Sequence, residues 1–181
     1  MKTIILVRHA KSSWENPSLD DFDRPLNKRG KRDAPFMGKK LKERNILPDV
    51  IVSSQAKRAR KTAKEIAKAI GYPKKRIVFH EELYHADATD LLSLVKKLDN
   101  GIKTVMLFGH NNTFNEFADL LLAQNPVYNI PTTGVYSIGF SVDRWEKVSA
   151  GKGESNFFDY PKRYLQELAR LEDSANPIKS G

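Results

Sequence analysis

An unbroken apolar run near the start of the chain, residues 4–7 (IILV), most constrains how it can fold. The run has no alternating polar positions, so it predicts a strand that is buried on both faces, as in a parallel α/β sheet. Arg8 and His9 follow this run directly. Ligands of open α/β sheets bind beyond the carboxyl ends of the strands. The sequence therefore places a fixed cation and a titratable imidazole where an anion can bind.

Further apolar segments alternate with amphipathic ones along the chain. Residues 57–70 are the clearest helix: alanines and isoleucines form one stripe, lysines lie opposite, and Gly71 ends the pattern. Asn27 and Asp87 can cap helices, and residues 113–116 match a capping box. The pattern predicts strands over 2–7, 49–53, 76–80, 103–108, 134–141 and 144–148, and helices over 27–44, 57–70, 87–98, 113–124 and 161–172.

This alternation of strands and helices predicts an α/β fold, a three-layer α/β/α sandwich with a mostly parallel central sheet. A length of 181 residues, of which 40% are hydrophobic, fits one domain over residues 1–181. Residues 10–26 form a long polar loop of the kind that is often functional. The last eight residues are expected to be loose.

The chain contains no cysteine, which excludes disulfides, thiolate zinc sites and a cysteine nucleophile. This composition fits a reducing cytoplasm, and we expect a cytoplasmic protein. The early apolar run is too short for a signal peptide, and no stretch is long enough for a transmembrane helix. We therefore expect no membrane partner.

The net charge of +9 is unevenly distributed. Residues 1–76 contain 21 Lys and Arg against 8 Asp and Glu, whereas residues 77–181 contain 10 against 14. The basic part also carries Arg8 and His9, so its field favours a phosphorylated or otherwise acidic partner. Nucleic acid would respond to the same charge, but no aromatic and basic platform accompanies it, and we expect no nucleic-acid partner.

Polar groups also follow two other predicted strands. The second strand leads to Ser53 and Ser54, with Arg58 in the first turn of the next helix, and the fourth leads to His110 just before a helix start. In a parallel sheet these ends meet at one edge, and two helix N-termini add backbone N–H donors. Two arginines, two histidines and two helix starts are the elements of a site for a tetrahedral dianion.

The motifs and their order resemble the histidine phosphatase superfamily, which is phosphoglycerate mutase-like, and within it the SixA-like branch of phosphohistidine phosphatases. The stretches that carry the resemblance are Leu6–Ala10, Asp23–Gly30, Ser53-Ser54 through Arg58-Ala59 to Thr62-Ala63, Leu107–Asn111 and Phe158–Lys162. Ala10 stands where most members of the superfamily have glycine.

The resemblance implies a role for each principal side chain. His9 would be the nucleophile that forms a transient phosphohistidine, with its other ring nitrogen held as N–H by an acceptor. Arg8 and Arg58 would clamp the phosphoryl oxygens. His110 would donate to the same oxygens as an imidazolium. Neither a metal nor another cofactor is needed in this scheme.

Several assignments stay open at this point. The helix pattern does not distinguish Arg58 from Arg60, and only the motif favours Arg58. Substrate contacts are expected from Ser12, His85 and Asn111. Many superfamily members have a glutamate general acid where this chain has His85, so the leaving-group acid is His85, Glu82 or Asp87. A phosphohistidine substrate, whose leaving imidazole is weakly basic, needs less help from an acid.

The sequence thus predicts a metal-independent phosphatase that acts on a phosphorylated protein or a small phosphorylated substrate, most readily on protein phosphohistidine. The alternatives are a small-molecule phosphomonoesterase of the same superfamily and a non-catalytic phosphoprotein-binding module. A phosphomonoesterase often has a helical cap over its pocket, and this chain has no spare segment for one. A binding module has no need of both histidines. The four histidines show no metal-binding spacing such as HExxH, and no P-loop motif is present.

Overall fold

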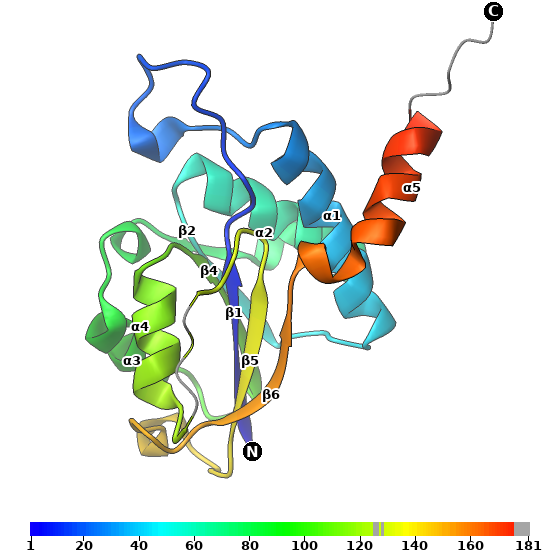
Figure 1. Cartoon of the computed structure of the whole chain (residues 1–181). Helices are drawn as coiled ribbons and strands as arrows, with labels where there is room; N and C mark the ends of the chain where they lie inside the picture. The colour runs from blue at the N-terminus through cyan, green and yellow to red at the C-terminus, as the bar shows by residue number, and fades with distance from the viewer. Residues whose placement is uncertain (125–126, 128, 176–181) are drawn as a thin grey trace, which may run out of the picture.

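A central sheet of six strands organises the computed structural model, which describes residues 1–124, 127 and 129–175 (Figure 1). The strand order is β3-β2-β4-β1-β5-β6. The pairs β1–β4, β2–β4 and β2–β3 are parallel, while β5 is antiparallel to both β1 and β6. The strands are β1 (Lys2–Arg8), β2 (Val50–Ser54), β3 (Val78–His80), β4 (Thr104–Gly109), β5 (Val135–Phe140) and β6 (Glu154–Asp159).

Helices cover both faces of the sheet and confirm the predicted three-layer α/β/α fold. One apolar cluster joins one face of β1 and β4 to α1, α2 and α5, and a second joins the other face to α3 and α4. Residues 4–7 are buried on both sides, as their composition predicts. The helices are α1 (Lys28–Glu43), α2 (Lys57–Ile70), α3 (Ala88–Lys96), α4 (Thr113–Leu121) and α5 (Leu165–Ala175).

Capping determines where several helices begin and end. The Asn27 side chain accepts from the backbone N–H of Gly30, and Asp87 caps α3 in a capping box. Gly71, with φ of 80°, ends α2. The capping box predicted over 113–116 is wrong: Thr113 is already helical, and its hydroxyl donates to the carbonyl of Ala86 at 2.9 Å instead.

The strand predicted over residues 144–148 is wrong. Trp145–Lys147 form a 3₁₀ turn, in which Trp145 is fully buried and its indole N–H donates to the carbonyl of Ile102 at 2.8 Å. The apolar residues Trp145 and Val148 are three apart, which matches the period of a 3₁₀ turn better than that of a strand. The sixth strand is instead β6, whose polar first half lies exposed at the sheet edge.

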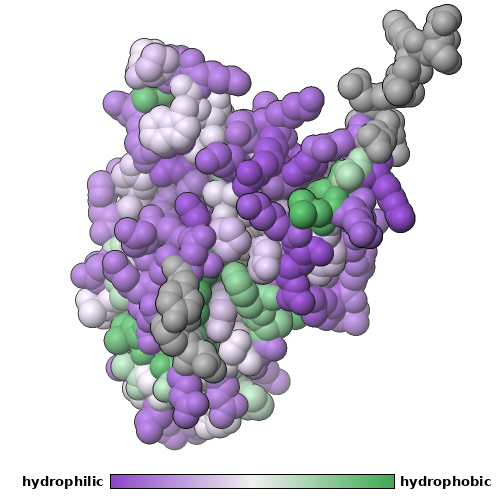
Figure 2. Space-filling model, viewed as in Figure 1, coloured by the Kyte–Doolittle hydropathy of each residue, from purple (hydrophilic) through white to green (hydrophobic). Residues whose placement is uncertain are grey.

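Smaller departures concern element ends. The third strand is shorter than predicted because residues 74–76 form a 3₁₀ turn, and α3 and α4 end two and three residues early. Of the last eight residues, which were expected to be loose, 176–181 lie outside the described residues. Hydrophilic residues cover most of the face seen in Figure 2. Among the described residues, no helix combines the length and apolar character that crossing a membrane requires.

The first turn of α1 packs directly on the loop that follows β1. A Cβ atom added at Gly30 would collide with the backbone carbonyl of Lys11. Loop residues 10–12 are therefore held against α1 by close backbone contact. The backbone N–H of Asn27 also donates a hydrogen bond to the carbonyl of Lys11 at 3.0 Å.

We predict that Gly30→Ala destabilises the fold by about 1–3 kcal/mol, because the backbone of Lys11 cannot move aside as a flexible side chain can. Urea denaturation followed by circular dichroism measures this loss. The control Lys31→Ala alters the next residue, whose side chain is exposed, and should leave stability within about 0.5 kcal/mol. Equal stability of Gly30→Ala and the wild type would contradict the packing described here.

Candidate active site

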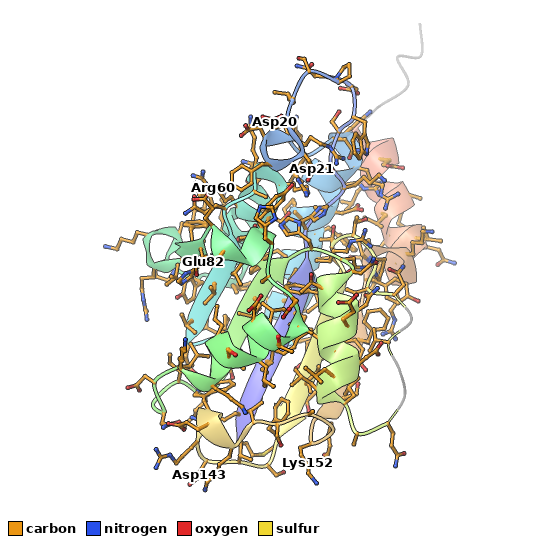
Figure 3. The ribbon with its side chains drawn as sticks, turned by 90° about the vertical axis from the view of Figure 1, so that its left-hand side faces the viewer. Asp20, Asp21, Arg60, Glu82, Asp143 and Lys152 are labelled. Atoms are coloured by element: carbon orange, nitrogen blue, oxygen red, sulfur yellow. The ribbon has the colours of Figure 1, made fainter. Side chains whose placement is uncertain are left out.

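The carboxyl ends of β1, β2 and β4 meet at one edge of the sheet, as the sequence predicts. In the ladders, Arg8 pairs with Gly109, and Ser53 pairs with Phe108. The residues that follow these pairs, His9, Ser54 and His110, are therefore neighbours in space. Figure 3 shows the loop that carries Asp20 and Asp21 above this edge of the sheet.

His9 has one ring nitrogen committed and the other directed into the site. Its Nδ1 lies 2.8 Å from the carbonyl oxygen of Ala10, which can only accept, so Nδ1 carries the hydrogen. Nε2 consequently has a lone pair. Ala10 is itself fixed, because its N–H donates to the hydroxyl of Thr62 at 2.9 Å and it is fully buried.

Arg58 faces this lone pair from the first turn of α2. Its Nε–H donates to Nε2 of His9 at 3.2 Å, and one terminal nitrogen lies 3.4 Å from Nδ1 of His110. The guanidinium is buried, and its outer side is held by Asp21. Arg60 is exposed and lies over the ring of Phe79. The structure thus places Arg58, and not Arg60, beside the histidines.

His110 completes the pair of imidazoles, with ring centroids 5.2 Å apart. Its Nε2 lies 2.9 Å from the hydroxyl of Ser54, and an arginine can only donate to its Nδ1. The neutral ring therefore carries its hydrogen on Nε2. Without a bound anion, burial lowers the pKa of His110 to about 4, and the charges of Arg58 and Arg8 lower it too, against the opposing charge of Asp21. The imidazolium expected with a bound phosphoryl group stays a prediction.

The pKa of His9 is lowered further, to about 3. Burial is the largest cause, and the neighbouring His110, Arg58 and Arg8 lower it too, against the opposing effect of the Ala10 carbonyl. Both imidazoles are consequently neutral near pH 7. A bound dianion would bring negative charge to the site and favour protonation of His110.

Arg8 lies at the end of β1 with part of its donor capacity unused. One terminal nitrogen donates to the carbonyl of Ile130 at 2.9 Å, while Nε is buried and has no partner among the described protein atoms. Burial lowers the pKa of Arg8. A partly buried cation whose buried Nε–H is unused is suited to bind an anion.

Of the three residues expected to contact substrate, Asn111 lies beside Arg8, while Ser12 and His85 make other contacts. Asn111 follows His110 and donates to the same Ile130 carbonyl that Arg8 binds, at 2.9 Å. Ser12 is buried, and its hydroxyl accepts from Arg24 at 2.6 Å rather than contacting either imidazole in the described structure. His85 is exposed, with its ring 4.6 Å from that of Tyr84.

The two carboxylate candidates for the leaving-group acid lie elsewhere. The side chain of Asp87 accepts from the backbone N–H groups of Thr89 and Asp90 and so caps α3. Glu82 is exposed and lines an apolar groove between β3 and α3. Figure 3 shows Glu82 well away from Asp21. Among the described residues, no three His, Asp or Glu side chains gather as a metal site requires.

Sequence reasoning missed Asp21. Its carboxylate binds Arg58 at 2.7 Å, Arg24 at 2.6 Å and the hydroxyl of Tyr84 at 2.6 Å. The available signal was a set of acidic residues in the loop of the most basic part of the chain. Nothing in the sequence separates Asp21 from its neighbours Asp20 and Asp23.

Comparisons with known proteins identify the family and the fold. The model of the histidine phosphatase superfamily (branch 1) matches residues 4–97. An uncharacterized chloroplastic protein of Arabidopsis thaliana is 37% identical over 128 residues, which are 66% of this chain and 59% of that protein. A 2,3-bisphosphoglycerate-dependent phosphoglycerate mutase of Bartonella bacilliformis is 32% identical over 97 residues, 52% of this chain and 47% of that protein. The chain thus spans less than two thirds of either relative.

Solved structures match over greater lengths. A candidate phosphohistidine phosphatase SixA from Agrobacterium tumefaciens is 30% identical, with a TM-score of 0.74 over 88% of this chain and 98% of that one. The protein histidine phosphatase SixA complexed with tungstate shares the fold, with a TM-score of 0.77 and 20% identity over 89% of this chain and 98% of that one. The fold is therefore phosphoglycerate mutase-like, and the chain belongs to the histidine phosphatase superfamily, branch 1.

Proposed function

We propose that this chain is a phosphatase that hydrolyses protein phosphohistidine through a phosphoryl intermediate on His9. The observation that carries the proposal is the state of His9: its Nδ1–H is bound to a carbonyl, and its Nε2 lone pair faces Arg58. A neutral imidazole nitrogen that is held beside fixed cations is the arrangement that attack on a phosphoryl group needs.

In the first step, the Nε2 lone pair of His9 forms a bond to phosphorus while the bond from phosphorus to the leaving atom breaks. The electron pair of that bond stays on the leaving group. Arg8 and Arg58 hold the phosphoryl oxygens as planar donors. His110, once protonated in the presence of the dianion, donates from Nδ1 to the same oxygens.

In the second step, a water oxygen attacks phosphorus and the N–P bond breaks. The electron pair returns to Nε2 of His9, both protons of the water stay with the released phosphate as dihydrogen phosphate, and the imidazole is neutral again. The Nδ1–H bond to Ala10 persists throughout, so the ring keeps its orientation. The proposed scheme uses no cofactor and no metal.

The surroundings of the site support a phosphohistidine substrate. Neither Glu82 nor Asp87 contacts the imidazoles in the described structure, which favours a substrate whose leaving group needs little protonation. The likeness to SixA structures points the same way. We accordingly propose a phosphorylated protein as partner, a single domain over residues 1–181 and, because the chain has no cysteine, a cytoplasmic location.

A small phosphate ester is the second candidate substrate. It is favoured by the similarity to phosphoglycerate mutases and by the shared fold of a phosphoserine phosphatase of Entamoeba histolytica, with a TM-score of 0.64. Steady-state kinetics with a phosphohistidine peptide, a phosphotyrosine peptide and 3-phosphoglycerate decide between them. A kcat/KM that is highest for 3-phosphoglycerate would overturn the phosphohistidine proposal.

His9→Ala should abolish turnover and the covalent incorporation of phosphate, because no other imidazole nitrogen takes the place of Nε2. Acid-quenched labelling with a ³²P-labelled substrate measures the intermediate, and steady-state assays measure turnover. Retention of either the label or the activity in the variant would exclude His9 as the nucleophile.

Arg58→Ala should lower kcat/KM by about 100- to 1,000-fold, as removal of one preorganised electrostatic donor typically does. The matched control Arg60→Ala removes an arginine from the same helix that lies over Phe79, and its kcat/KM should stay within about twofold of the wild type. If the control loses as much activity as Arg58→Ala, the assignment is reversed.

The neutral histidines make stability depend on pH. In the unfolded chain a histidine takes up a proton below about pH 6.5, whereas folded His110 does so only near pH 4. Between pH 6.5 and pH 4 the unfolded chain therefore binds more protons than the folded one. The free energy of unfolding consequently decreases as the pH falls through this range. At pH 5, His9 and His110 should each lower the free energy of unfolding by about 2 kcal/mol relative to pH 7.5.

His110→Gln should remove roughly half of this acid-dependent loss, because His9 remains. Urea denaturation of the wild type and of the variant at pH 7.5 and pH 5 gives the two differences. An identical pH dependence in both proteins would show that His110 is not held neutral by burial.

A further inference from the structure

The carboxylate of Asp21 lies on the solvent side of the buried Arg58. The two side chains meet at 2.7 Å, with 44% of the Asp21 side chain exposed against 7% for Arg58. Tyr84, which donates to the same carboxylate, also has its ring 5.3 Å from that of His110. Asp21 and Tyr84 therefore line the outer edge of the site, next to Arg58 and His110.

The hydrogen bonds to Asp21 leave it able to accept one more. Oδ2 accepts from Arg58 and from Tyr84, and Oδ1 accepts from Arg24. A carboxylate has about four acceptor directions, so one remains on Oδ1 among the described contacts. Desolvation raises the pKa of Asp21, but the hydrogen bonds from Tyr84, Arg24 and Arg58 outweigh it and hold the pKa far below its usual range. Asp21 is thus a fixed negative charge rather than an acid.

The direction of the reaction brings the leaving group to this edge. In-line attack by Nε2 of His9 requires the leaving group to depart on the opposite side of phosphorus. His9 follows the last residue of β1, and Asp21 lies on the solvent side of the arginine that contacts Nε2 of His9, with 44% of the Asp21 side chain exposed. A leaving group that belongs to a protein must extend toward solvent, and it therefore passes this carboxylate. The charge of the leaving group is therefore sensed by the Asp21 carboxylate.

We propose that Asp21 is a specificity-determining residue, which selects phosphoryl groups attached to a positively charged leaving group and disfavours leaving groups that carry a carboxylate. The application of this charge selection to phosphohistidine rests on the proposed function. A phosphohistidine ring that is protonated on its free nitrogen is such a group. When its N–P bond breaks, the electron pair moves to the ring, and the ring departs as neutral imidazole without a proton from the enzyme.

Two small phosphate esters test the charge selection directly. Phosphoethanolamine carries an ammonium group, whereas 3-phosphoglycerate carries a carboxylate. The measurements are the dissociation constant of each ester by calorimetry and kcat/KM for each ester and for a phosphohistidine peptide. The wild type should favour phosphoethanolamine over 3-phosphoglycerate.

Asp21→Asn keeps the size of the side chain and the backbone carbonyl that Arg58 binds, but it removes the charge. It should reduce the preference for phosphoethanolamine by about tenfold, the effect expected of a half-exposed charge at close range. The control Asp20→Asn removes the same charge from the adjacent exposed residue, whose side chain does not cap the turn that follows it. Its preference should match that of the wild type.

A second readout needs no variant. Raising the ionic strength from about 0.05 M to 0.5 M should reduce the wild-type preference severalfold, because salt screens exposed charges. The proposal is overturned if Asp21→Asn weakens both esters equally, since Asp21 then only orients Arg58, or if salt leaves the wild-type preference unchanged. Failure of the wild type to hydrolyse the phosphohistidine peptide would refute the proposed function alone, because the two esters still decide the role of Asp21.

Discussion

The contact between Nε of Arg58 and Nε2 of His9 is the interaction on which the rest of the site depends. An arginine can only donate, so this contact determines which nitrogen of His9 keeps a lone pair, and the Ala10 carbonyl determines it again from the other side of the ring. The two constraints agree. Formation of this contact requires α2 to begin at the carboxyl end of β2, next to β4 and β1, which is the sheet order observed.

Burial of so many basic groups has an electrostatic cost that the site meets in two ways. The histidines are held neutral, so Arg8 and Arg58 face no imidazolium in the unliganded protein. Asp21 supplies a negative charge next to Arg58 from a loop that Arg24 ties together through Ser12, the Ser13 carbonyl and Asp21 itself. An incoming phosphoryl dianion would then raise the pKa of His110, so that binding of the anion is coupled to uptake of a proton from solvent.

The sequence predicted those parts of the fold that burial dictates. Strands β1 and β4 are continuous apolar runs because helices cover both faces of the sheet, and α2 shows its core face as a plain helical stripe. Strand β6 was missed because an edge strand needs few apolar residues, and Trp145 was misread because a buried aromatic residue does not reveal whether a strand or a turn carries it.

The site was predictable where a motif follows a strand, as for Arg8, His9 and His110, and less so where a loop folds back. The choice between Arg58 and Arg60 depended on the direction of two neighbouring side chains on one helix. The contact of Asp21 depended on the path of a loop of seventeen residues, 10–26. The charge state of His110 depended on how deeply it is buried beside two arginines, which spacing alone does not express.

The site draws its side chains from β1, α2 and the segment after β4, elements that lie far apart in the chain but adjacent in the sheet. Any oxyanion that these groups grip together acts as a crosslink between distant segments. Since unfolding must separate those segments, occupancy of the site stabilises the whole sheet, by about 2.7 kcal/mol when the free ligand is at one hundred times its dissociation constant. An oxyanion that occupies the site therefore also slows thermal unfolding and the proteolysis that depends on unfolding.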